Sequence, residues 1–184
     1  MSDAPTPSDP TTGEPVDGSL TEDEQLSLTM LPSLIGSAVA FSSKSGAVGT
    51  VKEMMANAKA AVAGRTDYPD NELIKSLLPN LEDAGAAMEK AKEMRDEQVA
   101  RLQSAGVTSM EEMKAHTLAQ AAEVKELLAG KVDDLEASQY KEWVLNVADS
   151  VAKAAKEGGF LGFGGEQVSE EETETIAEVK KALD

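Results

Sequence analysis

The single histidine, His116, is the first residue to weigh for chemistry, because imidazole serves both as a metal ligand and as a general base near neutral pH. A di-iron site in a helical bundle needs two Glu-x-x-His pairs together with further inward-facing glutamates. Here Met113 stands three residues before His116 and Glu112 stands four before, so both spacing and number fail. A serine triad would also need this one histidine as its base. We expect His116 to be a boundary or exposed residue, and we predict no catalytic residue and no cofactor.

The carboxylates and the missing cysteines limit the chemistry further. The chain has no cysteine, which excludes disulfides, thiol catalysis and Cys-ligated metals. Paired carboxylates on helix faces are more often solvated i,i+4 partners than acid/base couples. The acids also lack the calcium-loop spacing with its central glycine. These patterns predict that the protein binds no metal and is not an enzyme.

The glycine-rich segment 157–172, EGGFLGFGGEQVSEEE, is the most unusual local feature. A phosphate loop needs a preceding strand and a Gly-Lys-Ser/Thr ending, and glutamates 170–172 occupy the helix N-terminus where an anion would lie. Phe160, Leu161 and Phe163 have two interpretations. They fold back as a plug on one end of the bundle, or they stay partly exposed as a docking or gating loop. We favour the plug, because two of the three phenylalanines of the chain lie here.

The same region carries a resemblance. The run Gln139-Tyr140-Lys141-Glu142-Trp143 leads into residues 157–165, and Val168-Ser169 and Glu172 follow. This pattern resembles the C-terminal half of small uncharacterised bacterial all-helical proteins that share an EGGFLGFGG-x-x-VS-x-x-E element. The resemblance covers roughly a quarter of the chain and implies a helical fold without an assigned activity. The loop with Val-Ser-Glu-Glu-Glu is also similar to helical tellurite-resistance-type domains, whose acidic metal-binding pattern this chain does not reproduce.

The charge of the chain narrows the range of partners. The net charge is −17, from 34 acidic and 17 basic residues. A nucleic-acid-binding protein needs clustered Lys and Arg to neutralise phosphates, and an anionic membrane surface makes the same demand. We therefore expect no nucleic acid and no anionic membrane as a partner. Solubility or a saline cytoplasm explains the acidity better than a basic partner does, because the acids form no block outside the N-terminal residues.

Composition predicts an all-α fold. Apolar residues make up 41% of the chain but aromatic residues only 3%, so the core must consist of Ala, Leu, Val and Met, which favours packed helices. Residues 1–18 are rich in Pro, Thr, Ser and Asp and predict a disordered acidic tail before a single helical-bundle domain at 19–184. The first basic residue is Lys44, which argues against a secretory signal and, with the absence of cysteine, predicts a cytoplasmic protein.

The first helix is predicted to begin at Thr21, with Glu24 completing a capping box. The stretch 25–43 is uncharged and long enough to span a membrane, but its serines, proline and glycine make it too polar for hydrocarbon. We expect a buried central helix and no integral membrane segment. Pro32 should kink this helix or mark its true start.

The remaining helices follow from apolar seams at three- and four-residue steps. The second helix is expected to end at Gly64, a proline at position 79 should divide the third region into a short and a long helix, and Gly106, Gly130 and Gly158 should end later helices. Capping boxes are expected at Thr108–Glu111 and Ser169–Glu172. The seams are Val48, Val51, Met55, Ala58 and Val62; Ile74, Leu78, Leu81, Gly85, Met88, Ala91, Met94 and Leu102; Met110, Met113, Thr117, Ala121, Val124 and Leu128; Tyr140, Val144, Val147, Val151 and Ala154; and Ile176, Val179 and Leu183.

These elements predict a bundle of about five to six helices with short connections. The function expected from it is that of a non-enzymatic structural or protein-interaction bundle, with a protein partner or self-association. The alternative is a bundle that binds a small apolar ligand or a lipid, with a pocket beside Met30, Ser33 and Ser37 that the phenylalanine loop helps to line.

Overall fold

The computed structural model describes residues 19–42, 46–79, 84–156 and 168–184, and every element within these ranges is a helix. The predicted all-α bundle is confirmed, and the region after Asp70 is divided in two as expected. The predicted tail, residues 1–18, lies outside the described residues. The helices are α1 (Glu22–Ser42), α2 (Gly46–Asp67), α3 (Glu72–Leu77), α4 (Ala84–Ser104), α5 (Met110–Lys131), α6 (Asp134–Lys156) and α7 (Glu170–Leu183).

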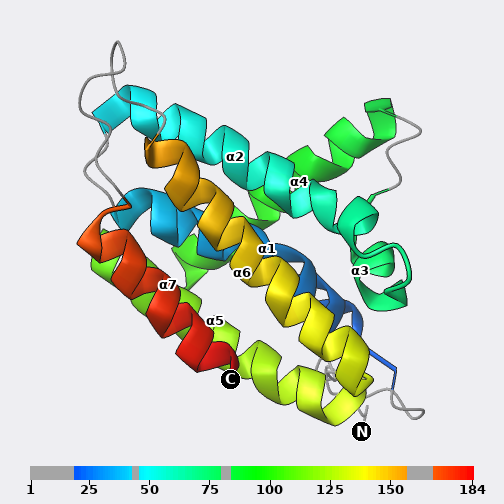
Figure 1. Ribbon diagram of the computed structural model, residues 1–184. Helices are drawn as coiled ribbons and strands as arrows, with labels where there is room; N and C mark the ends of the chain where they lie inside the picture. The colour runs from blue at the N-terminus through cyan, green and yellow to red at the C-terminus, as the bar shows by residue number, and fades with distance from the viewer. Residues whose placement is uncertain (1–18, 43–45, 80–83, 157–167) are drawn as a thin grey trace, which may run out of the picture.

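Helix α1, which has no charged residue after Glu24, lies at the centre, and α2, α5, α6 and α7 pack around it (Figure 1). Nearly all of its side chains from Leu28 to Ala40 are buried. Among the described helices, α1 alone is long and apolar enough to cross a membrane, and 61% of its apolar window is buried by the rest of the protein. The part of α1 after Glu24 has no charged residue and needs burial on several sides, which agrees with the expected central position.

Capping boxes begin three of the helices. In the box of α1, the Thr21 amide donates to Glu24 Oε2 at 2.7 Å, as predicted. The box predicted at Thr108 is wrong by one residue, because Ser109 is the N-cap of α5 and exchanges hydrogen bonds with Glu112. The Thr108 amide and hydroxyl donate to the same carboxylate and, with Ser109, lower the pKa of Glu112. The third box, at the start of α7, lies at Ser169 as predicted.

Pro32 does not end α1 but stands in the middle of it. A proline has no N–H, so the carbonyl of Leu28, four residues before it, lacks its helical donor. The hydroxyl of Tyr140 in α6 donates to this carbonyl at 2.6 Å, and both groups are buried. The tyrosine therefore replaces the hydrogen bond that the proline removes, and it ties α6 to α1 at this point.

This pairing predicts a non-additive effect of two substitutions. Tyr140→Phe should lower the free energy of unfolding by about 1–2 kcal/mol, because a buried carbonyl loses its donor. Pro32→Ala restores the amide N–H, so Tyr140→Phe should cost less in the Pro32→Ala background. A double-mutant cycle from urea melts measures this difference, and equal costs in both backgrounds would contradict the proposed replacement.

Because of the same tyrosine, we expect the protein to lose stability at high pH. Burial raises the pKa of Tyr140 well above its usual value of about 10. The unfolded chain therefore loses this proton near pH 10 while the folded chain keeps it, so stability is complete below pH 10 and falls as the pH rises beyond it. The fall can reach about 1.4 kcal/mol per pH unit for one group. Urea melts between pH 9 and 11 should show a flatter decline for Tyr140→Phe than for the wild type.

Helix α6 carries the clearest amphipathic face, and its predicted seam is confirmed. Tyr140, Val144, Val147 and Val151 are all buried. Trp143 is buried beside them and meets the Tyr140 ring edge-on, with the ring centroids 5.5 Å apart. This face contacts α1 and α2 and forms the largest part of the core.

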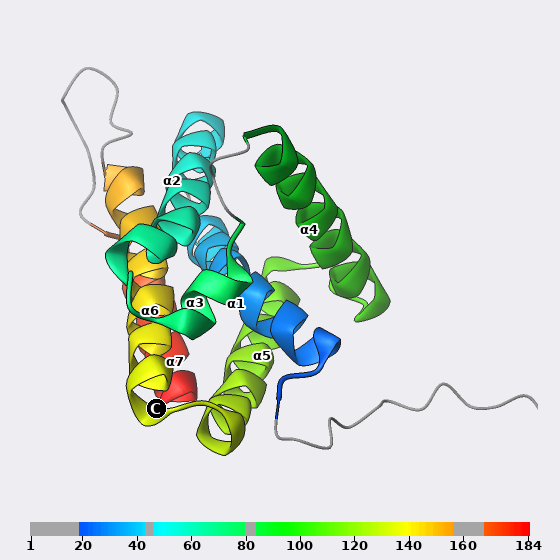
Figure 2. The same ribbon diagram turned by 90° about the vertical axis from the view of Figure 1, so that its right-hand side faces the viewer.

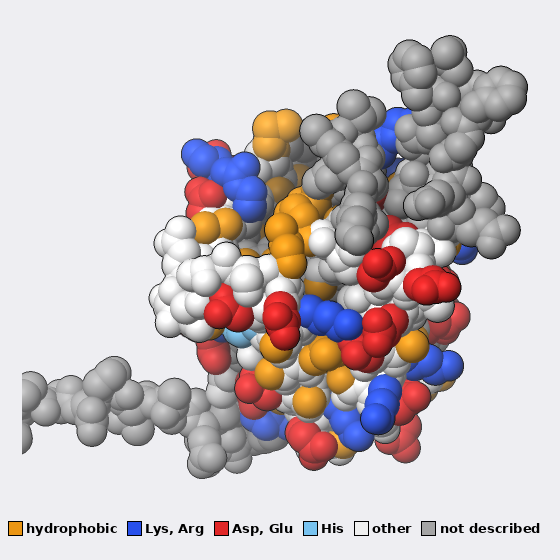
Figure 3. All heavy atoms as spheres, turned by 90° about the vertical axis from the view of Figure 1, so that its left-hand side faces the viewer, with side chains coloured by type: hydrophobic (Ala, Val, Ile, Leu, Met, Phe, Trp, Pro, Cys, Tyr) orange, Lys and Arg blue, Asp and Glu red, His pale blue; other side chains and the backbone are white. Residues whose placement is uncertain are grey.

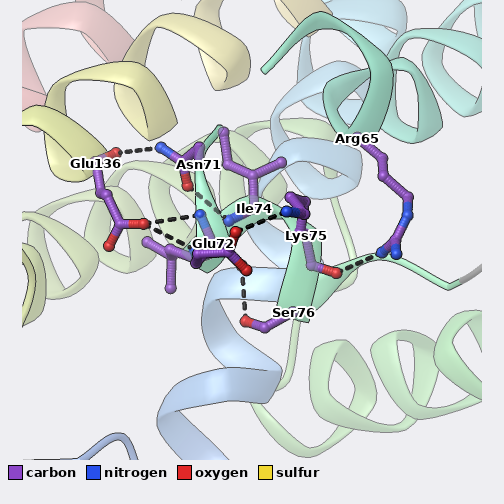
Figure 4. A network of polar contacts seen from close by, with 8 residues as sticks. Arg65, Asn71, Glu72, Ile74, Lys75, Ser76 and Glu136 are labelled. Atoms are coloured by element: carbon purple, nitrogen blue, oxygen red, sulfur yellow. Dashed lines mark hydrogen bonds and ion pairs between the residues drawn. The ribbon is translucent and has the colours of Figure 1, made fainter. Parts of the chain in front are cut away.

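The short helix α3 joins the ends of α2 and α6 through polar contacts (Figure 4). Asn71 caps α3 by accepting from the Ile74 amide at 2.8 Å, and its side-chain amide donates to the carbonyl of Glu136 at 3.1 Å. The Glu136 carboxylate accepts from the amides of Glu72 and Leu73 at the N-terminus of α3. Although Glu136 lies in the first turn of α6, its carboxylate therefore stabilises the start of α3.

Helix α4 stands away from the bundle along most of its length (Figure 2). None of its described side chains is buried, and its packing against the other described helices is sparse. The predicted seam is therefore wrong in the first half of this helix, where Met88 is 76% exposed. Gly106, with φ of 70°, ends the segment as expected, and the Val107 amide donates to the Leu102 carbonyl at 3.0 Å.

Candidate interaction surface

Helix α2 shows its most apolar side to solvent. Val51 is 60% exposed, Met55 is 69% exposed and Val62 is 37% exposed, and Ala58 lies between them on the same side. The sequence predicted these residues as the buried seam, and that prediction is wrong. The buried side is the opposite one. It carries the polar residues Glu53 and Asn57, and also Gly64.

The contact with α1 explains part of this orientation. The Asn57 amide nitrogen donates to the Ser33 carbonyl at 3.0 Å and to the Ser37 hydroxyl at 3.3 Å. Gly36 leaves space for this amide, since a Cβ at that position would overlap the Asn57 side chain. A polar pair buried in this way is held to one geometry, so it sets which side of α2 faces α1.

The contact with α6 favours the same orientation of α2. The indole of Trp143 lies directly over Gly64, where a Cβ would be 2.5 Å from its Nε1 atom. The indole N–H points toward the Ala60 carbonyl at 3.4 Å. A large ring from α6 therefore needs the side of α2 that consists of small residues, and the valines and methionines are left on the outside.

The charges along the exposed side of α2 differ from those of the whole chain. From Val51 to Thr66 the basic residues are Lys52, Lys59 and Arg65, and the one acid, Glu53, is buried. Lys52 and Lys59 are exposed, while Arg65 donates to the carbonyls of Lys75 and Leu78. In a protein with a net charge of −17, this side of α2 is both apolar and basic.

Helix α4 also exposes large apolar side chains to solvent. Besides Met88, Val99 is 46% exposed. Six of the eight large hydrophobic side chains that are exposed in the described part of the protein belong to α2 and α4. In the view of Figure 3, hydrophobic side chains are open to solvent in both the upper and the lower part of the face, among charged ones. We use the name α2/α4 surface for the outward residues Val51, Met54, Met55, Ala58 and Val62 of α2 together with Met88 and Val99 of α4; the two helices are consecutive in the chain and have little or no direct contact with each other.

The last turns of α4 carry an ion pair and an apolar contact that join it to α1. Arg101 forms ion pairs with Asp23 of α1 at 2.5 Å and with Glu97 of its own helix at 3.0 Å. The hydrogen bond that Arg101 donates to the Asp23 carboxylate is the main cause of its raised pKa. Leu102 and His116 line a cavity of about 20 Å³ beside this contact, together with Met30. His116 is half-buried there, in agreement with its expected boundary position.

The other candidate sites have less support from the structure. Phe160, Leu161 and Phe163, the predicted docking or gating loop, lie outside the described residues. Within the described ranges, no group of three or more His, Asp or Glu side chains is placed to hold a metal ion. An open depression of about 490 Å³ between α1 and α5 is bordered by four acids among nine residues, and Lys131 there bonds to Glu24 at 2.8 Å. This bond is the main cause of a lowered pKa at Glu24.

Of all these features, only the α2/α4 surface combines exposed apolar side chains with a distinct charge, so we take it as the candidate functional site. The sequence held one sign of this surface, because three bases stand against a single acid, Glu53, between Val51 and Thr66. Comparison with known proteins adds no assignment: no protein-family model matches the chain, and no curated protein or solved structure shows significant similarity to it.

Proposed function

We propose that this protein is a non-enzymatic helical bundle that binds another protein through the α2/α4 surface. The observation that supports the proposal is the orientation of α2. A helix whose heptad-spaced valines and methionines face water, while a buried asparagine and a glycine face the core, has an apolar side ready for a partner. Scattered single hydrophobic residues need no such explanation, but here most of the large ones are concentrated on two consecutive helices.

The alternative of a small apolar ligand or lipid has less support. The cavity that Met30 lines is about 20 Å³, whereas ligand pockets usually measure roughly 300–1,000 Å³. Ser33 and Ser37, which were expected beside such a pocket, are engaged by Asn57. We therefore base the proposal on the surface of the protein and not on its interior.

Site-specific photo-crosslinking in the producing cell tests this function. A photoreactive phenylalanine at position 55 or 88 should form one discrete adduct with a protein, because both positions lie within the α2/α4 surface. The same residue at position 138 of α6 or 174 of α7, both exposed and outside this surface, should not form it. Equal adducts from all four positions, or none from 55 and 88, would overturn the proposal.

A further inference from the structure

Helix α4 meets the bundle with one half-buried side. Of its described side chains none is buried, and the half-buried ones follow one another along the helix at positions 87, 94, 98, 101 and 102. Met88 and Val99 are exposed on another side. A helix that buries so little apolar surface is among the parts of a protein that separate from it most easily.

The last turns of α4 lie over an apolar strip of α1, which consists of Met30, Leu31 and Leu34. These three residues line one wall of the cavity of about 20 Å³, and Arg101 and Leu102 of α4 line another. Each residue of the strip is at most 7% exposed. The cavity has room for roughly one water molecule, so the two walls lie close together. If α4 moved away, the strip would lose part of its cover and meet water.

The ion pair beside this contact is of a kind that breaks easily. Arg101 Nη2 lies 2.5 Å from Asp23 Oδ1, but the two side chains are 35% and 74% exposed. Ion pairs in contact with water contribute little to stability and are screened by salt. The pair therefore fixes the position of α4 without holding it firmly.

The composition of α4 allows it to leave the strip as a helix. Its residues from Met88 to Leu102 are nearly all strong helix formers, and Glu97 and Arg101 form an ion pair one turn apart. The helix has 21 residues, which is longer than the roughly 12–15 residues below which isolated helices are marginal. Residues 105–109, with Gly106 at a φ of 70°, connect it to α5 and provide a point about which it can turn.

We propose that α4 is an arm that opens and closes over the strip of α1, with the Asp23–Arg101 ion pair as its latch. The structure shows the closed arrangement. Opening exposes Met30, Leu31 and Leu34 together with the half-buried side of α4, and salt favours it because salt screens the latch. The inference goes beyond the proposed function and does not require a partner.

Thiol labelling tests the opening, because the chain has no cysteine of its own. Leu34→Cys places a thiol on the strip, and Ile35→Cys places one at the next position, which is fully buried and does not line the cavity. Each full-length variant reacts with excess DTNB in the absence of denaturant. Opening of α4 exposes position 34 alone, whereas global unfolding exposes both positions. We therefore expect the thiol at position 34 to react at least about tenfold faster. Equal rates would overturn the inference.

Changes at the latch should alter this rate. Asp23→Asn removes the ion pair, so the thiol at position 34 should react about two- to fivefold faster, while the rate at position 35 stays the same. Added salt should accelerate labelling at position 34 less in this variant than in the chain that keeps Asp23. Glu178→Gln, which removes an ion pair between α5 and α7, is the matched control and should leave the rate unchanged. An equal acceleration by both substitutions, or by neither, would contradict the latch.

Distances between spin labels test the same movement with both labels on the surface. The labels are attached to cysteines introduced at positions 92 of α4 and 138 of α6, which are both exposed. Asp23→Asn combined with Leu102→Ser removes both contacts of the last turns, so the distance should become longer and its distribution broader. Labels at position 123 of α5 and position 138 should keep one narrow distance in the same background. An unchanged distance between positions 92 and 138 would overturn the inference even if the buried cysteine variants fail to fold.

Discussion

Replacing Val147 by aspartate is expected to abolish most of the stability of the protein. Val147 is fully buried on α6, between Val144 and Val151, which are also fully buried. A carboxylate at this position would have no cation beside it, and burial of an unpaired charge costs on the order of several kcal/mol. That cost is comparable with the total stability of a typical domain, about 5–15 kcal/mol. Urea melts followed by circular dichroism should show a large fall in the midpoint, or no folded baseline at all.

The matched control lies on the same helix. Leu135→Asp introduces the same charge near the N-terminus of α6, where the leucine is 65% exposed. It should change stability by less than about 0.5 kcal/mol, because the carboxylate stays in water and the helix dipole favours it. If both variants unfold at the wild-type midpoint, the described core face of α6 is wrong.

Adding a single methyl group at Gly64 is expected to have the second largest effect. In Gly64→Ala the new Cβ would lie 2.5 Å from Nε1 and 2.6 Å from Cε2 of Trp143. Either the indole or α2 must move, and overpacking of this kind costs about 1–3 kcal/mol. The movement would also weaken the contact of the indole N–H with the Ala60 carbonyl. We expect a loss near the upper end of this range, together with an altered tryptophan fluorescence, since Trp143 is the only tryptophan.

Gly130 provides the comparison for this glycine. It also lies within a helix, but no atom comes within 4 Å of a Cβ placed there. Gly130→Ala should therefore stabilise the protein by up to about 1 kcal/mol through the helix propensity of alanine. Opposite signs at the two glycines would show that the effect comes from the contact with Trp143. A stabilising Gly64→Ala would mean that α2 does not face α6 with this side.

The elements that were predicted correctly are determined by residues close to each other in the sequence. The boxes at Thr21 and Ser169 need only residues three positions apart, and the seam of α6 separates clearly from its charged side. Helix α2 differs, because alanines occur all around it and two sides look suitable for a core. The choice between them depends on Ser33 and Trp143, which lie in other helices.

The candidate site was missed for the same reason. A stripe of Val51, Met55 and Val62 has the same appearance in a sequence whether it packs inside the protein or against a partner. Only the position of Asn57 and Gly64 against their neighbours shows that the stripe faces outward. The plug formed by Phe160 and Phe163 stays a prediction, because these residues lie outside the described ranges.

The bond between Tyr140 and the Leu28 carbonyl has a consequence for synthesis of the chain. The two residues are 112 positions apart, so α1 leaves the ribosome long before Tyr140 is synthesised. Until then the Leu28 carbonyl lacks the hydroxyl that donates to it in the folded protein. At about 5–20 residues per second, this delay is roughly 6–22 seconds. During that time α1, which is apolar after its acidic first turn and contains Pro32, has neither α6 nor α7 to cover it. The nascent chain therefore passes through a stage at which the apolar side chains of α1 have no α6 to pack against, and this stage ends only when α6 is made.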